Sequence, residues 1–167
     1  MICRRVAPYL TAFVIVVSMS GCSTCGVTHF SGRREVPKKL PPGGEILVVV
    51  PARSQWTSTG VVAKPGEKYR FLSLPPDRWY DLLKASSSGG YLSFWFQRSA
   101  EKCRRVPSAP WFILCGSIEP TGTPFVVKKD EGAIMLERGE IGLFANDVPR
   151  AYWNNFGHLK VRITRLH

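Results

Sequence analysis

The chain consists of short apolar runs that glycine and proline residues separate. The clearest run lies near the C-terminus, where Leu159, Val161 and Ile163 alternate with polar residues. An alternation with period two is typical of a strand that buries one face. Similar runs predict further strands over residues 45–50, 53–56, 60–63, 69–73, 91–97, 111–118, 124–127, 133–136 and 140–145. Strands at this spacing predict an all-β sandwich or barrel.

A helix is expected only at Arg78–Ala85. Pro75-Pro76-Asp77 precedes this segment, and the serine and glycine residues of 86–90 follow it. Prolines that open a segment and glycines that end it are typical helix boundaries.

The N-terminal residues 1–21 have the pattern of a secretory signal peptide. Arg4 and Arg5 precede an apolar run that ends in Met19-Ser20-Gly21-Cys22. This ending resembles the lipobox of bacterial lipoproteins, which implies that Cys22 carries the lipid anchor. Met19 replaces the usual leucine, so ordinary cleavage or an uncleaved anchor remain alternatives. Ser23 in the next position implies, by the same resemblance, the outer membrane of the cell envelope.

Residues 22–44 are rich in Gly, Pro and basic residues and predict a lipid-anchored flexible tether. One domain is expected over residues 45–167. Disulfide bonds persist after export, so Cys103 and Cys115 are expected to form a disulfide, with two buried thiols as the alternative. The Cys22, Cys25 and His29 pattern is not expected to bind zinc, because lipidation would remove a ligand.

The chain is basic, with 23 Lys and Arg residues against 12 Asp and Glu residues. For an exported chain, the acidic partner is expected to be lipid head groups, envelope polysaccharide or a host surface rather than nucleic acid. A solvated basic surface without a partner explains the charge equally well.

Residues 146–157 form a polar segment between two strand-like runs. Asp147 supplies one carboxylate, and Asn154 and Asn155 supply two adjacent amide oxygens. Ca²⁺ prefers such oxygen ligands and takes about 6–8 of them. The sequence therefore predicts a calcium site, although Asp and Asn side chains in a turn also commonly bond only to their own backbone.

This segment resembles the calcium-binding loop of the PA-IL-like family of bacterial galactose-binding lectins. The similarity rests on Asn146-Asp147-Val148-Pro149, Tyr152, Asn154-Asn155 and Gly157, with weaker similarities over residues 45–166. The resemblance implies a jelly-roll β-sandwich of the galactose-binding-domain type. It also implies a bound calcium ion that itself contacts two hydroxyl groups of a sugar.

The resemblance assigns roles to individual residues. Asp147, Asn154 and Asn155 would bind calcium through side chains, and Ala151 and Ala63 through backbone carbonyls. Asp147 and Asn154 would also contact the sugar.

The family orients galactose with a His and a Gln from a mid-chain loop, and this chain lacks both there. No His occurs between His29 and His158, and Gln55 and Gln97 lie outside the corresponding loop. Galactose specificity therefore does not follow. Trp153 could stack on a sugar face or cover the core.

An enzyme is not expected, because the chain has no nucleophile elbow, no phosphate-binding loop and no mid-domain histidine to act as a base. The predicted function is carbohydrate binding by an exported, lipid-anchored lectin-like protein. The alternative is an envelope scaffold or interaction lipoprotein that binds protein or anionic lipid through its basic surface.

Overall fold

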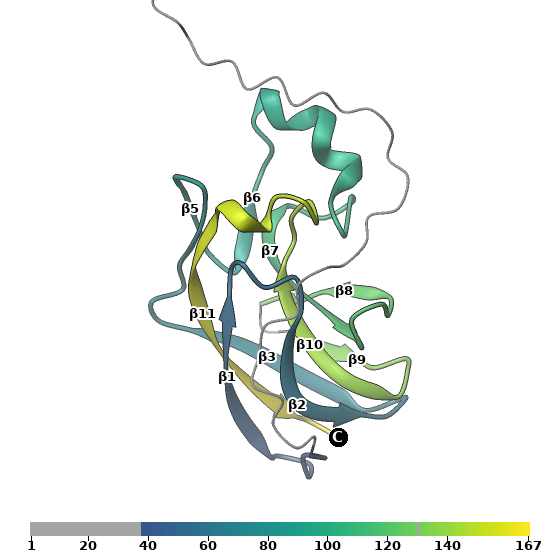
Figure 1. Ribbon diagram of the computed structural model, residues 1–167. Coiled ribbons are helices and arrows are strands. Elements are labelled where there is room, and N and C mark those ends of the chain that lie inside the picture. The colour runs from purple at the N-terminus through teal and green to yellow at the C-terminus, as the bar shows by residue number, and fades with distance from the viewer. Residues whose placement is uncertain (1–37, 130) are drawn as a thin grey trace, which may run out of the picture.

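The strands form two antiparallel sheets in the computed structural model, which describes residues 38–129 and 131–167. The first sheet has the order β5-β4-β11-β3-β9, with β1 also paired to β11. The second has the order β2-β10-β7-β6, with β8 also paired to β7. The sheets face one another across an apolar core (Figure 1), so the predicted all-β sandwich is confirmed.

The strands of the first sheet are β1 (Glu45–Pro51), β3 (Lys68–Leu74), β4 (Trp79–Asp81), β5 (Lys84–Ser86), β9 (Gly132–Ile134) and β11 (Asn155–Arg165). Those of the second are β2 (Thr57–Ala63), β6 (Gly89–Tyr91), β7 (Trp111–Ile118), β8 (Pro124–Val126) and β10 (Gly139–Ala145). Two 3₁₀ helices, η1 (Trp95–Cys103) and η2 (Tyr152–Asn154), complete the described elements. Among the described residues, no helix is long and apolar enough to cross a membrane.

Strand β11 is the longest strand and holds the first sheet together. It pairs with β1 along one edge and with β4 and then β3 along the other. Leu159, Val161 and Ile163 are fully buried, as their alternation predicts. They belong to the same core cluster as Ile141 and Leu143 of the opposite sheet.

Three predicted elements are wrong. The helix expected at Arg78–Ala85 is instead the hairpin of β4 and β5, because the fully buried Trp79 and the pairing of β4 with β11 outweigh the local helix signals. The strand expected over 91–97 ends at Tyr91, and most of the apolar residues that predicted it lie exposed before and within η1. The strand expected over 53–56 is also not found, and turn residues occupy that segment.

The predicted disulfide between Cys103 and Cys115 is absent from the described residues. Cys115 lies in β7 and packs with Trp56 and Phe144, whereas Cys103 ends η1. Burial raises the pKa of the Cys115 thiol to about 12, so this thiol is a core group.

The domain begins before the predicted residue 45. Leu40 is buried, and the backbone N–H of Lys38 donates to the Gly60 carbonyl at 2.7 Å. Part of the predicted tether is therefore folded onto β2. The signal peptide, Cys22 and the rest of the tether lie outside the described residues.

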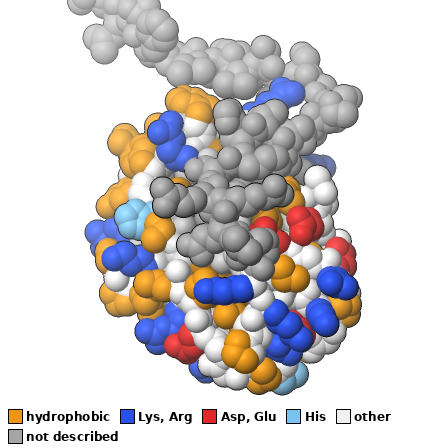
Figure 2. All heavy atoms as spheres, turned by 60° about the horizontal axis from the view of Figure 1, so that its bottom comes forward, with side chains coloured by type: hydrophobic (Ala, Val, Ile, Leu, Met, Phe, Trp, Pro, Cys, Tyr) orange, Lys and Arg blue, Asp and Glu red, His pale blue; other side chains and the backbone are white. Residues whose placement is uncertain are grey.

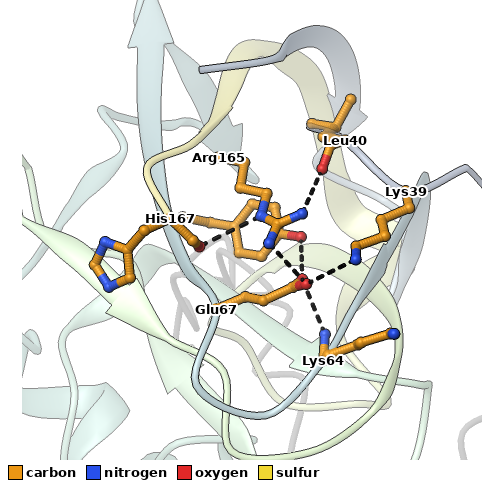
Figure 3. Close-up of polar contacts among 7 residues, drawn as sticks. Lys39, Leu40, Lys64, Glu67, Arg165 and His167 are labelled. Carbon is orange, nitrogen blue, oxygen red and sulfur yellow. Dashed lines mark hydrogen bonds and ion pairs between the residues drawn. The ribbon is translucent and has the colours of Figure 1, made fainter. Parts of the chain in front are cut away.

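Glu67 joins three segments at the end of the sandwich that holds the C-terminus (Figure 3). Its Oε1 lies 3.0 Å from the Arg165 guanidinium and 3.7 Å from Lys39 Nζ. Its Oε2 accepts hydrogen bonds from the Tyr69 hydroxyl at 2.7 Å and the Lys64 N–H at 3.0 Å. Arg165 also donates to the Leu40 carbonyl at 2.7 Å. One carboxylate thus ties the N-terminal segment, the β2–β3 turn and the last strand together.

We expect Glu67→Gln to lower the free energy of unfolding by about 2 kcal/mol at pH 7. Burial by itself would raise the pKa of Glu67, but the hydrogen bonds from Tyr69 and Lys64 and the charges of Arg165 and Lys39 outweigh it and hold that pKa below 4.5. The carboxylate therefore contributes stability above pH 4.5 that is lost as the pH falls through its folded-state pKa.

Urea unfolding of both proteins at pH 7 and at pH 3 measures this effect. The difference in the free energy of unfolding between the wild type and Glu67→Gln should be smaller at pH 3 than at pH 7. The control is Glu131→Gln, whose ion pair with Lys128 is exposed and should contribute little. Equal losses from the two substitutions would contradict the role of Glu67.

Candidate cation and ligand site

The polar loop 146–157 follows β10, contains η2 and includes the first three residues of β11. Asn146 fixes the start of this loop. Its Oδ1 accepts a hydrogen bond from the Val106 N–H at 2.9 Å, and its Nδ2 donates to the Pro110 carbonyl at 2.9 Å. The buried Tyr152 donates its hydroxyl to the Ala145 carbonyl. The Asn146 contacts hold the loop against the segment that follows η1, and the Tyr152 contact holds it against the end of β10.

Asp147 is a buried carboxylate, with 1% of its surface exposed. Its Oδ2 accepts a hydrogen bond from Asn155 Nδ2 at 2.9 Å, and its Oδ1 accepts one from the Val148 N–H at 2.7 Å. None of the ion pairs among the described residues involves Asp147. Burial therefore raises its pKa to about 7, although the hydrogen bond from Asn155 opposes the shift.

The side-chain oxygens of Asn154 and Asn155 are buried, and neither has a hydrogen-bond partner among the described residues. Asn155 Nδ2 also donates to the Ala52 carbonyl at 3.3 Å, which leaves its Oδ1 as the atom without a donor. A buried acceptor without a donor costs about 1–3 kcal/mol. Carboxylate and amide oxygens are the ligand types that a hard cation such as Ca²⁺ prefers.

A second carboxylate, Asp81, lies beside this loop. Asp81 pairs with Asn155 in the register of β4 and β11. Its Oδ2 accepts a hydrogen bond from the Tyr91 hydroxyl, to which Gln97 Nε2 donates at 2.9 Å. Burial raises the pKa of Asp81, and the charge of Asp81 in turn raises the pKa of Asp147. An ionised Asp81 therefore disfavours the ionisation of Asp147.

Sequence reasoning missed Asp81, because the segment around it was expected to be a helix. The signal that could have found it is the alternation of Trp79, Tyr80 and Asp81, which fits a short strand with Trp79 and Asp81 on one face. The two mid-chain glutamines are also at this end. Gln97 contacts Tyr91, and Gln55 Nε2 donates to the Pro149 carbonyl in the loop at 2.9 Å.

Ala63 is not part of this cluster. It ends β2 opposite Gly139, whereas Thr57 at the other end of β2 pairs with Leu143, next to the loop. A strand of this length separates the two ends by about 20 Å. The structure therefore does not bring the Ala63 carbonyl, which the resemblance assigned as a calcium ligand, to this loop. Ala52, whose carbonyl already accepts from Asn155, is the backbone oxygen that the structure brings close.

The remaining predicted residues lie in or beside η2. The Ala151 carbonyl accepts the Asn154 N–H at 3.1 Å and faces the turn that carries both asparagines. Trp153 has 73% of its surface exposed, so it does not cover the core.

Among the described residues, no three His, Cys, Asp or Glu side chains gather as a metal cluster. A cation here would depend on amide and backbone oxygens as well as on carboxylates.

The metal-free protein should become less stable as the pH rises. Below pH 3.8 the stability contributed by protonated Asp147 is fully present, and it is lost as the pH rises through about 7. For one group the slope is at most about 1.4 kcal/mol per pH unit. Asp147→Asn should remove this slope. Melting temperatures in EDTA from pH 5 to pH 8.5 test it, with Glu137→Gln, at an exposed position, as the control. A variant that keeps the wild-type slope would contradict the assignment.

No family model and no curated protein matches this sequence. Among solved structures, the fold is similar to that of a chain described as "EclA N-terminal domain; PllA-like lectin". The TM-score is 0.47 and the identity 19%, over 71% of this chain and 94% of that chain. A likeness of this degree does not identify the ligand or the residues that bind it.

Proposed function

We propose that the loop 146–157 binds a calcium ion, and that the bound ion holds hydroxyl groups of a carbohydrate. The observation that carries the proposal is the pair of buried side-chain oxygens on Asn154 and Asn155, which accept no hydrogen bond from the described residues. Asn155 also donates to the carboxylate of buried Asp147. A divalent cation would satisfy these oxygens and would also offset the repulsion between Asp147 and Asp81.

The proposed ligands are the side chains of Asp147, Asn154 and Asn155 and the carbonyl of Ala151. Asp81 is added because it lies beside Asn155. Calcium would supply a Lewis acid with coordination positions left for two sugar hydroxyls. The chain would contribute the remaining contacts through Asp147 and Asn154, and Trp153 would stack on the apolar face of a sugar ring.

The proposed setting is the cell envelope, with the chain exported and lipid-anchored at Cys22, at the outer membrane. This part rests on the lipobox-like sequence around Cys22. The proposed activity is binding and not catalysis.

An envelope interaction protein that binds through its basic surface is the second candidate. Figure 2 shows Lys and Arg side chains spread over the end of the molecule that holds the C-terminus, where acidic side chains are fewer. This distribution suits an anionic partner but does not define a particular site.

We expect calcium to raise the melting temperature of the wild-type protein, because it binds only the folded state. At 100 times the dissociation constant the stabilisation is about 2.7 kcal/mol. Asp147→Asn should remove the calcium-dependent shift, and Glu137→Gln should keep it. Thermal melts at pH 7.5 in calcium and in EGTA measure both. A wild-type protein without any shift would exclude the calcium site.

A glycan array in calcium tests the second half of the proposal. Binding should be lost in EGTA and in Asp147→Asn. Trp153→Ala should weaken it by roughly tenfold, the loss of one stacking contact, without changing the calcium-dependent melting shift. A protein that binds calcium but no glycan would favour the interaction-protein candidate.

A further inference from the structure

The loop end of the sandwich carries large apolar side chains that are exposed to solvent. We call this surface the apolar rim, and its members are Leu82, Leu83, Leu92, Trp95, Phe96 and Trp153. We propose that the apolar rim inserts into the lipid–water interface of an anionic membrane. This inference goes beyond the proposed function and does not depend on a bound metal or sugar.

The rim is assembled from three separate segments of the chain. Asn155 pairs with Asp81, so Trp153, just before β11, lies near the Leu82–Leu83 turn that joins β4 to β5. Lys84 Nζ lies 5.3 Å from the centre of the Phe94 ring, which brings the start of η1 to the same hairpin. Figure 1 shows the β4–β5 turn, η1 and η2 together at the end opposite the C-terminus.

Nothing in the described part of the chain covers these side chains. Leu83 is 88% exposed and Trp95 is 82% exposed. The nine residues of η1 include none that is buried, so this helix stands outside the core. Soluble monomers rarely expose many large apolar side chains in one region, and those that do mostly use them for binding.

Basic side chains surround the rim and indicate which partner fits. Exposed basic residues come from every segment at this end, namely Arg53, Lys84, Arg98, Lys102 and Arg150. The nearby acids Asp81 and Glu101 are only partly exposed, and Asp81 already accepts from Tyr91. Apolar and Trp side chains bordered by Lys and Arg are the pattern of a surface that enters the head-group region of anionic lipids.

A second copy of this chain fits the rim less well. A symmetric dimer through the rim would bring the same basic side chains, such as Arg98 and Lys102, toward their counterparts. Like charges facing one another across an interface oppose association. Anionic lipid offers both the apolar medium for the rim and the negative charge for its border.

Tryptophan fluorescence can test the insertion in the full chain. No tryptophan precedes Trp56 in the sequence, so the N-terminal segment adds no signal. Trp56, Trp79 and Trp111 are buried, which leaves Trp95 and Trp153 as the exposed reporters. The full chain is mixed with vesicles that contain brominated acyl chains, either phosphatidylcholine alone or with phosphatidylglycerol. EGTA and the absence of any glycan separate this test from the proposed function.

We expect quenching by the brominated lipid, and more of it with phosphatidylglycerol. Leu83→Asp combined with Phe96→Asp keeps both reporters and should reduce the quenching by roughly twofold or more, since charged side chains do not enter the interface. The control is Leu47→Asp, at a position on β1 that is 56% exposed. Its tryptophan fluorescence should be quenched by the vesicles as much as that of the wild type. Melting temperatures should show that all three proteins are folded.

The charged border has its own expected effect. Arg98→Gln and Lys102→Gln should each raise the phosphatidylglycerol vesicle concentration that gives half-maximal quenching by about fivefold. The inference is overturned if wild-type Trp95 and Trp153 are not quenched, or if the rim and control variants lose quenching equally. It is also overturned if the wild type forms a dimer without lipid that the rim variant does not form.

Discussion

The register of β11 is the constraint on which both the core and the candidate site depend. With β1 on one side and β3 and β4 on the other, this strand cannot shift without breaking two ladders at once. A shift of one residue would turn Leu159, Val161 and Ile163 from the core to the solvent. The same shift would separate Asn155 from Asp81. The strand that fills the core therefore also positions the polar groups at its first residue.

The candidate site is kept at a cost in stability. Asp147, Asn154 and Asn155 lie in a poorly solvated region, where burial raises the pKa of the carboxylate and the two amide oxygens accept no hydrogen bond from the described part of the chain. A loop with only a structural role would be more stable with apolar or fully paired side chains here. At the other end of the sandwich, Glu67 shows the opposite arrangement, in which every contact favours the charged form except burial itself. The contrast between the two acids supports a binding role for the loop.

The sequence predicted what depends on local pattern. The alternation in residues 159–163 predicted β11, and the oxygen-rich residues 146–157 predicted the candidate loop. The alternation of Trp79, Tyr80 and Asp81 could have predicted a strand, but not its position beside the loop, because the pairing of β4 with β11 joins segments far apart in the chain. Ala63 was placed at the site by a resemblance in sequence order, while the direction of β2 carries it to the other end. The apolar residues 92–96 predicted a strand because pattern alone does not distinguish an apolar run that is buried from one that is exposed.

The Glu67 contacts also make the two ends of the domain different. Lys39 and Leu40 are fixed beside Arg165, at the end of β11, while the loop and the apolar rim lie at its beginning. An eleven-residue strand is about 35 Å long. The Glu67 contacts thus lie at one end of the domain, and the groups proposed to bind a ligand lie at the other. A ligand bound at the loop would therefore be kept apart from Lys39 and Leu40 by the length of one strand, and the domain would act as a spacer between the two ends.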